Sequence, residues 1–428
     1  MTGTEVLSQH KTEKRGLPRG PEILAPAGSP ERLQTALTYG AHAVYLGGPD
    51  FNLRAQSLGF TLQDLHQALQ TVHALGRRVY YCLNTLPWPE QMPALQEHLA
   101  LLAQCPPDAL IVADPGVLDL ARDVLPQVPI HLSTQANTGN AQAARFWQGQ
   151  GVTRVNLARE LSFKGIGDIR RSVPDLELEV FVHGAMCMAI SGRCHMSAYL
   201  NQRSANQGQC THPCRFQYRP VTLEEAQRPG EALWDIQDQR GYSALLASED
   251  LALIDFMAWL VKTGVDGLKI EGRMKTSSYL AQVLDVYVTA LADVQSRTFR
   301  PKLYWQELRL ASTRPLGTGF FLPGRRKRLY TPKPGEPAAP VVGKILSQEE
   351  KGGWRVSCRH QWPAGHRVSC LIPGLKRPVL EPTYYALENE RGERIQVLHS
   401  GQTGRLRCEH PDLAPGLMLR RCPGMNTG

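Results

Sequence analysis

Short runs of apolar residues alternate with longer stretches of helical periodicity through the first two thirds of the chain. The apolar runs are rich in Val, Ile, Leu and Tyr and end at glycine or polar residues, as buried parallel strands do. The predicted strands are Glu22–Gly28, Ala43–Gly47, Arg78–Asn84, Ala109–Ala113, Ile130–Ser133, Arg154–Leu157, Leu176–Val182 and Gly267–Glu271. The predicted helices cover residues 30–40, 62–75, 93–104, 117–124, 140–149, 166–172, 251–263 and 277–296.

This alternation predicts an α/β fold, because a strand followed by a helix and another strand forms a parallel sheet. Eight such units are enough to close a (β/α)8 TIM-like barrel. An open, doubly wound sheet is the alternative. In either fold the carboxyl ends of the strands lie on one side of the sheet, where enzymes of this class place their active sites.

The remaining regions differ in composition from the predicted barrel, which spans residues 21–298. Residues 1–20 are polar and basic and are predicted to be a disordered tail. A segment rich in Pro, Gly and Arg at 299–340 is predicted to be a basic linker. From 341 to 428, short alternating runs separated by turn residues predict a small C-terminal antiparallel β-barrel domain. A cysteine-rich insertion at 184–248 interrupts the first domain.

Four of the ten cysteines lie in that insertion, at Cys187, Cys194, Cys210 and Cys214. The segment around them is rich in Gly, Ser, Asn and Gln and is predicted to be an ordered loop without helix or strand. Zinc sites usually contain a C-x2-C pair, which is absent here. The irregular spacing is more typical of four thiolates around an iron–sulfur cluster, with thiol redox chemistry and ordinary packing as the alternatives.

Composition and charge narrow the class of protein. The chain has 428 residues, of which 42% are hydrophobic and 20% charged, a balance typical of globular proteins. Neither a membrane-spanning run nor a secretory leader is evident, so we expect a cytoplasmic protein with reduced cysteines and no membrane partner. The net charge of +9 and a pI of about 9.1 favour a polyanionic partner such as RNA.

Charged side chains near the predicted strand ends are candidate catalytic and substrate-binding groups. Lys269, Glu271 and Arg273 alternate along the last strand, so we expect all three to point inward. Together they could act in catalysis or bind a dicarboxylate, and a structural ion-pair network is the alternative. Arg54 and Arg159 lie just beyond other strands and are predicted to bind anionic substrate groups.

His183 lies four residues before Cys187 and is a candidate for proton transfer or for orienting a ligand, and a histidine with satisfied hydrogen bonds behind the site is the favoured alternative. The same two residues could form the Cys–His pair of a protease. That interpretation gives no role to the other three cysteines of the insertion. The chain also lacks the G-x-S-x-G and H-E-x-x-H motifs of serine and zinc hydrolases.

A cluster of basic residues in the predicted linker is the candidate contact for RNA phosphates. It consists of Arg325, Arg326, Lys327 and Arg328. Tyr330, Trp354 and Trp362 follow nearby in the sequence and are predicted to stack on unpaired bases. A solvated linker and core aromatics of the C-terminal domain are the alternative interpretation.

The span Glu179–Ser197 resembles the signature of the collagenase-like "peptidase" family of unknown catalytic type. Further similar segments are Glu22–Gly28, Ser133–Asn137 and Lys269–Arg273. Within the family, Asn206–Arg215 is most similar to the YegQ type. The resemblance extends over nearly the whole chain beyond the tail.

The resemblance implies a tRNA modification protein that serves the 5-hydroxylation of wobble uridine without molecular oxygen and with prephenate as cosubstrate. It also implies a 4Fe-4S cluster held by Cys187, Cys194, Cys210 and Cys214. The expected partners are the tRNA anticodon loop and an electron-transfer or iron–sulfur assembly protein. A collagenase-like protease and an RNA-binding accessory protein with a structural cluster are the alternatives.

Overall fold

The structure is a computed structural model that describes residues 20–53, 59–187, 189–216, 249–322, 328–331, 339–349 and 353–422. The predictions for residues 1–19, Arg54, Arg325, Arg326 and Lys327 lie outside these ranges. Within them, no helix combines the length and the apolar character needed to cross a membrane.

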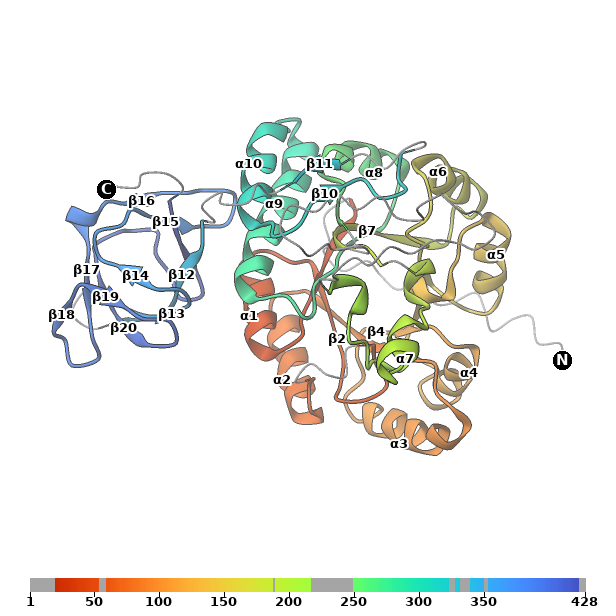
Figure 1. Cartoon of the computed structure of the whole chain (residues 1–428). Coiled ribbons are helices and arrows are strands. Elements are labelled where there is room, and N and C mark those ends of the chain that lie inside the picture. Colours follow the sequence, from red (N-terminus) through yellow and green to blue (C-terminus); the bar gives the residue numbers. More distant parts are fainter. Residues whose placement is uncertain are drawn as a thin grey trace, which may run out of the picture.

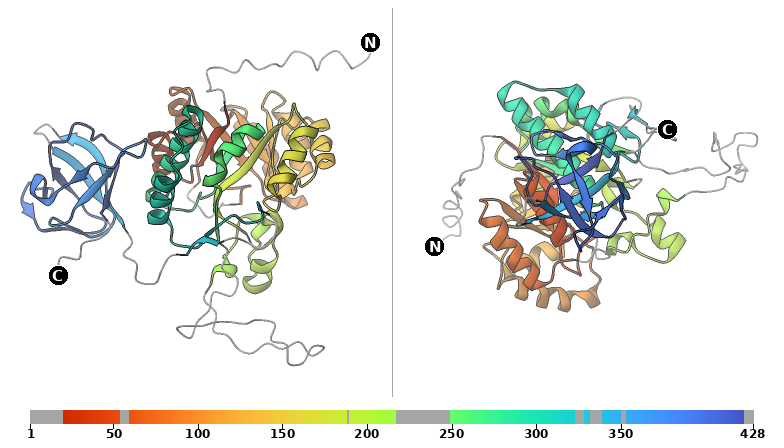
Figure 2. Two further views of the ribbon diagram at one scale, coloured as in Figure 1. Left: turned by 90° about the horizontal axis from the view of Figure 1, so that it is seen from above. Right: turned by 90° about the vertical axis from the view of Figure 1, so that its left-hand side faces the viewer.

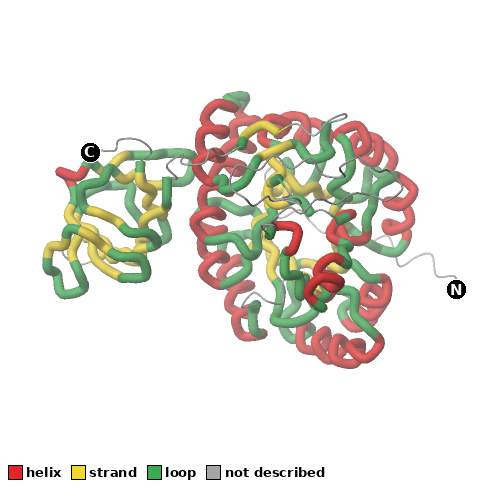
Figure 3. The backbone as a smooth tube through the Cα atoms, viewed as in Figure 1, coloured by secondary structure: helices red, strands yellow, loops and turns green. Residues whose placement is uncertain are grey.

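The first domain is a closed barrel of parallel strands surrounded by helices (Figures 1 and 3). Its strands are β1 (Glu22–Pro26), β2 (Ala43–Leu46), β3 (Arg78–Leu83), β4 (Ala109–Val112), β5 (Ile130–Leu132), β6 (Arg154–Asn156), β7 (Glu177–Ala185) and β9 (Gly267–Ile270). Each pairs with the next, and β9 pairs with both β7 and β1. This last pairing closes the sheet, so the predicted barrel is confirmed and the open-sheet alternative was wrong.

The helices around the barrel begin and end close to where periodicity places them. They are α1 (Pro30–Thr38), α2 (Leu62–His73), α3 (Met92–Leu102), α4 (Pro115–Val124), α5 (Ala141–Gly149), α6 (Phe163–Ser172), α8 (Met257–Thr263) and α9 (Ser277–Ser296). Side chains cap the first turns of α1, α2, α4, α5, α6 and α9. Ser29, for example, accepts a hydrogen bond from the Arg32 backbone N–H, with Pro30 as the first helical residue.

The two faces of the barrel sheet bury different side chains. Ile23 and Ala25 of β1 point outward into the large apolar core beneath the helices. Leu24, between them, points inward and joins a smaller interior cluster with Tyr45 and Tyr80. The interior also contains buried charges, so the barrel is a filled core that supports the functional face at its strand ends.

Three segments differ from their predicted secondary structure. The cysteine segment, predicted to lack helix, contains the short helix α7 (Met196–Asn201). The start of the helix predicted at 251–263 is instead the strand β8 (Asp250–Ala252), which pairs antiparallel with β7. The predicted linker contains the helix α10 (Pro301–Ala311) and the strands β10 (Leu316–Gly317) and β11 (Arg328–Tyr330). Pro301 is the first residue of α10, a position where proline is well tolerated.

The C-terminal domain is an antiparallel half-barrel that stands beside the first domain (Figure 2). Its strands are β12 (Val341–Glu349), β13 (Gly353–Cys358), β14 (Trp362–Pro363), β15 (Val368–Leu371), β16 (Val379–Leu380), β17 (Ala386–Glu388), β18 (Arg394–Ile395), β19 (Val397–Leu398), β20 (Thr403–Arg407) and β21 (Met418–Arg421). Trp354 and Trp362 are 7% and 0% exposed in its core. The prediction that these tryptophans stack on RNA bases was therefore wrong, because their rings pack against the sheet.

Polar contacts join the two domains across a buried interface. The Tyr39 hydroxyl donates to the Leu371 carbonyl and accepts from the Met418 backbone N–H, at 2.8 and 3.0 Å. Arg420 of β21 forms a two-point contact with Glu307 of α10 at 2.9 Å. The helix α10 therefore supports the C-terminal domain instead of linking to it loosely.

Candidate functional site

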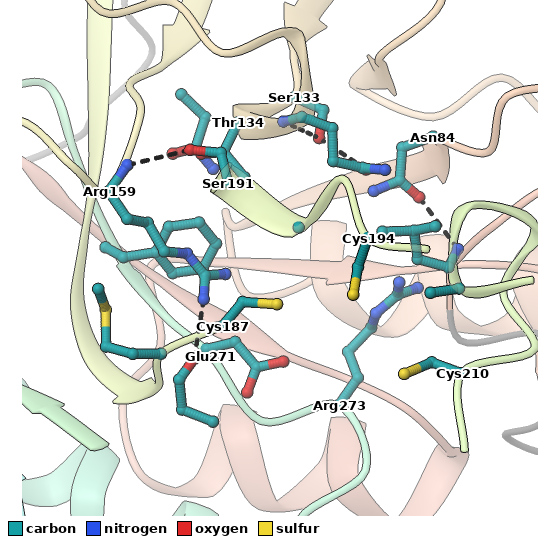
Figure 4. Close-up of a pocket in the computed structure, with 18 of the residues that line it drawn as sticks. Asn84, Ser133, Thr134, Arg159, Cys187, Ser191, Cys194, Cys210, Glu271 and Arg273 are labelled. Carbon is teal, nitrogen blue, oxygen red and sulfur yellow. Dashed lines mark hydrogen bonds between the residues drawn. The ribbon is translucent and has the colours of Figure 1, made fainter. Parts of the chain in front are cut away.

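A cavity of about 130 Å³ opens at the carboxyl ends of the barrel strands. The cysteines predicted to bind a cluster all line it: Cys187, Cys194, Cys210 and Cys214. The charged residues of the predicted site that line it are Arg159, Lys269, Glu271 and Arg273. Eight of the side chains selected from the sequence thus share one cavity, and Figure 4 shows six of them around it.

The cysteine segment is tied to the barrel mouth at several points. Glu160, just beyond β6, accepts hydrogen bonds from the Ser191 backbone N–H at 2.7 Å and from its hydroxyl at 2.6 Å. The Arg193 side chain donates to the Gln135 carbonyl at 2.7 Å. The Asn206 side chain accepts from the Cys194 backbone N–H at 3.2 Å. These contacts fix the short turns between the cysteines, so the segment is held over the cavity.

The four thiols line one cavity, and two of them accept hydrogen bonds from the backbone. Backbone N–H groups point at two sulfurs, from Met196 to Cys194 and from His212 to Cys210, each at 3.4 Å. Such N–H···S contacts stabilise thiolates and tune the potential of iron–sulfur clusters. Within the described ranges, no three Cys, His, Asp or Glu side chains gather closely enough to hold one metal ion. The thiols therefore face a shared cavity without forming a compact single-ion site.

Lys269, Glu271 and Arg273 line the cavity together, as their alternation predicts, but their environments differ. Lys269 is only 4% exposed and donates to the Glu179 carboxylate at 2.8 Å, inside the barrel. Its charge is thus already paired, which favours the structural alternative for this residue. Arg273 is buried, and its Nη1 donates to the Asn52 side chain at 3.1 Å. Figure 4 shows its guanidinium reaching between Cys194 and Cys210.

Arg159 lies at the opposite side of the cavity and is held in place on two sides. Its guanidinium carbon is 3.8 Å from the centre of the Phe181 ring, and its Nη1 donates to the Ala185 carbonyl at 2.8 Å. Stacking on an aromatic face and a backbone contact orient the planar group. The side chain is therefore a pre-positioned cation at the cavity wall, although its role in substrate binding stays a prediction.

His183 does not reach the cavity. Between Phe181 and His183 the pairing of β7 with β9 shifts by one residue, and His183 pairs with the outward-facing Ile270. The ring consequently turns toward α9, where its Nδ1 is 3.3 Å from the Tyr287 hydroxyl. Burial, with a smaller contribution from Lys275, lowers the pKa of His183 to about 3. His183 is therefore absent from the cavity lining, because the local bulge reverses the alternation, and this geometry favours the alternative of a buried histidine with its own hydrogen-bond partner.

Sequence reasoning overlooked several residues that build the site. Glu160, Ser191, Asn52 and Phe181 were not singled out as site residues, yet they position the cysteine segment or the arginines. Phe181 and Ser191 lie within the signature Glu179–Ser197, but the roles of all four residues depend on contacts with residues far away in the chain. Of the predicted RNA cluster, Arg328 belongs to β11, in the first domain, and the other three members lie outside the described ranges.

Residues 28–330 match the model of Peptidase family U32. The chain belongs to this family. The match begins within the first βα unit of the barrel and ends with β11, so it covers the barrel and the cysteine segment. Every residue from Ser133 to Arg273 that lines the cavity therefore lies within the range matched by the family model.

Curated U32 relatives have names that refer to RNA hydroxylation. "tRNA hydroxylation protein P" of Helicobacter pylori strain J99 is 38% identical, over 91% of this chain and 96% of the relative. The Escherichia coli K12 protein of the same name is 40% identical, over 64% of this chain and 68% of the relative. The "23S rRNA 5-hydroxycytidine C2501 synthase" of Escherichia coli K12 is 34% identical, over 62% of this chain and 38% of that protein.

Proposed function

We propose that this chain hydroxylates RNA, at C5 of the wobble uridine of tRNA, with a 4Fe-4S cluster on Cys187, Cys194, Cys210 and Cys214. The observation that carries the proposal is the single cavity shared by these cysteines and by the cations of the barrel mouth. The names of the U32 relatives support the reaction class, since two are tRNA hydroxylation proteins and one hydroxylates a cytidine of rRNA. The sequence similarity to the first of these extends over nearly the whole chain.

The cavity of about 130 Å³ opens at the barrel mouth, where an unpaired base could enter. A wobble base is unpaired in the anticodon loop, so it can be turned out of its stack at little cost. Polar side chains at the strand ends, among them Asn84 and Ser133, line the cavity and offer hydrogen bonds to a base edge.

The charged residues suit an anionic centre and an anionic cosubstrate. A bound 4Fe-4S cluster would supply one-electron transfer, and its four thiolates would carry negative charge. Arg273 lies among the cysteines and would offset that charge. Arg159 presents a fixed guanidinium, which can bind a carboxylate in two-point fashion. Prephenate, a dicarboxylate, is the cosubstrate that we assign to this pair of arginines.

Hydroxylation replaces the C5 hydrogen by a hydroxyl group; the hydrogen leaves as a proton and the base loses two electrons, so the reaction requires an oxygen donor and a two-electron acceptor besides the RNA. Glu271 lines the same cavity and is the described carboxylate placed to accept the C5 proton. His183 has no part in this scheme because its ring faces α9.

The first test is the metal content of the protein. Purified without oxygen, the wild type is expected to contain close to four irons and four sulfides per chain and to absorb visible light. Each of the variants Cys187→Ala, Cys194→Ala, Cys210→Ala and Cys214→Ala should lose most of this iron, because a cubane site needs every thiolate. Cys422→Ala, a partly exposed cysteine of the C-terminal domain, is the matched control and should keep it.

If fresh anaerobic protein contained zinc or no metal, the proposal that it binds a 4Fe-4S cluster would be wrong. The activity is measured in a separate experiment, by nucleoside mass spectrometry on unmodified tRNA incubated with prephenate and a two-electron acceptor. Formation of 5-hydroxyuridine by iron-loaded protein alone would establish catalysis. Tight tRNA binding without product would instead favour the accessory protein with a structural cluster. Gelatin cleavage that survives Cys194→Ala and Cys210→Ala would favour a protease.

A further inference from the structure

Large apolar side chains are exposed around the cavity mouth. Tyr199 is 87% exposed, Ile190 66%, Trp88 59%, Leu200 52% and Phe216 45%. These five residues are called the rim below. Large apolar groups at this exposure on one face mark a surface that binds a partner, whereas single exposed residues need no explanation.

The rim residues come from two loops that pack against each other. The helix α7 carries Tyr199 and contacts the short turns at Ala205–Gln207 and Pro213–Arg215. The loop after β3 joins the same group, because the Leu86 backbone N–H donates to the Asn206 carbonyl at 3.2 Å. Trp88 follows two residues later. Figure 1 shows α7 in front of the barrel strands, beside the open end of the barrel.

The segment that carries most of the rim has a marked charge bias. Residues 184–216 contain three arginines and no aspartate or glutamate. Two of these arginines, Arg193 and Arg203, are exposed. Exposed aromatic rings beside basic residues are the combination that binds single-stranded nucleic acid, because the rings stack on bases and the cations contact phosphates. An acidic protein surface would match the charge but would not require an exposed tyrosine ring.

We propose that the rim is the docking surface for an unpaired RNA loop, with Tyr199 stacked on a base adjacent to the one that enters the cavity. The proposal rests on the proposed function and adds the surface that holds the RNA. Arg203 lies two residues beyond the end of α7, where its backbone N–H donates to the Ser197 carbonyl at 3.4 Å, and its exposed side chain would contact the phosphate of the stacked nucleotide. A duplex cannot use this surface in the same way, because its bases already stack on one another.

The test compares RNA binding by matched tyrosine variants. Fluorescence anisotropy measures binding of a synthetic anticodon stem-loop and of a fully paired duplex of the same composition to anaerobic, iron-loaded protein. Tyr199→Ala is expected to weaken stem-loop binding about tenfold and to leave duplex binding unchanged. Tyr199→Phe retains the ring and should bind like the wild type. Tyr384→Ala removes a tyrosine that is 76% exposed in the C-terminal domain and should also have no effect.

Equal stem-loop affinities for Tyr199→Ala and Tyr384→Ala would overturn the proposal, whatever partner the rim then serves. Equal losses of stem-loop and duplex binding would also overturn it, since they would reflect charge and not stacking. The outcome is separate from that of the hydroxylation assay. Stem-loop binding that depends on the Tyr199 ring, without any 5-hydroxyuridine, would support the docking surface and refute the hydroxylation. Formation of 5-hydroxyuridine, with stem-loop binding that does not depend on the ring, would support the hydroxylation and refute the docking surface.

Discussion

Individual side chains inside the barrel show how burial decides ionisation. Arg154 is 3% exposed and contacts Glu22 and Glu177, so its charge is paired within the interior. Lys269 is paired with Glu179 in the same way. A buried charge is tolerated only with such partners. Where no carboxylate is in reach, as at His183, the group stays neutral instead.

The buried histidines are expected to make the protein sensitive to acid. The pKa of His183 is lowered to about 3 by burial, against about 6.5 in an unfolded chain. Burial and nearby cations lower the pKa of His131 as well. Below pH 6.5 the unfolded chain therefore binds more protons than the folded protein does. The contribution of the neutral histidines to the free energy of unfolding is complete above that pH and is lost as the pH falls toward 3.

For His183 alone, the loss at pH 5 is about 2 kcal/mol of the free energy of unfolding. Urea unfolding at pH 7 and pH 5 measures it. His183→Asn removes the titrating ring, so the difference in the free energy of unfolding between pH 7 and pH 5 should be smaller in this variant by about 2 kcal/mol. The exposed His399→Asn is the control. An unchanged difference in His183→Asn would show that His183 is not the group that titrates.

Among the secondary-structure elements, β7 has the strongest influence on the site. Its bulge turns His183 away from the cavity, and its end at Ala185 brings Cys187 to the barrel mouth. Gly184, between them, has a φ of +110° and lies directly against the last barrel strand. A Cβ atom at this position would lie 2.6 Å from the Glu271 carbonyl oxygen.

Gly184→Ala is therefore expected to lower the free energy of unfolding by about 2–4 kcal/mol, from the unfavourable φ and the contact together. It should also lower the iron content, because relief of the contact moves Cys187. Thermal unfolding and iron analysis measure the two effects. Gly149→Ala is the matched control, since no atom lies within 4 Å of its Cβ position and alanine favours the helix α5. Equal stability of the two variants would refute the steric argument.

Across the whole molecule, a buried ionic network joins the C-terminal domain to the barrel. Glu307 of α10 contacts both Arg377 and Arg420. Burial alone would raise the pKa of Glu307, but the two arginines lower it, so the carboxylate stays charged. Asp285 of α9 contacts Arg377 at 2.7 Å and accepts from the Gly374 backbone N–H. The network fixes the orientation of the small domain.

Breaking this network on one side leaves a buried charge without its partner. Arg420→Met is expected to cost about 3 kcal/mol of the free energy of unfolding, measured by urea titration. The double variant Arg420→Met, Glu307→Leu should cost less than the sum of the single variants, because neither charge then remains. Arg367→Met, which removes an exposed pair with Glu381, should cost less than about 1 kcal/mol. Additive losses in the double variant would argue against direct coupling.

The sequence by itself determined the order of strands and helices in the barrel, because both depend on local periodicity and on caps such as Ser29. It also determined that the four cysteines lie in one segment at the end of β7. The predicted placement of Lys269, Glu271 and Arg273 on one side agrees with the structure, although only Lys269 belongs to β9 and the other two lie just beyond its end.

Only the tertiary structure decided what depends on distant partners. His183 faces outward because β7 pairs with β9 through a bulge, which no local pattern records. Trp362 is buried and Tyr199 is exposed, although both are aromatic, because only Trp362 has a sheet to cover its ring. The segment with α10 has the composition of a linker, yet it packs between two domains. In each case the deciding free energy comes from contacts between residues far apart in the chain.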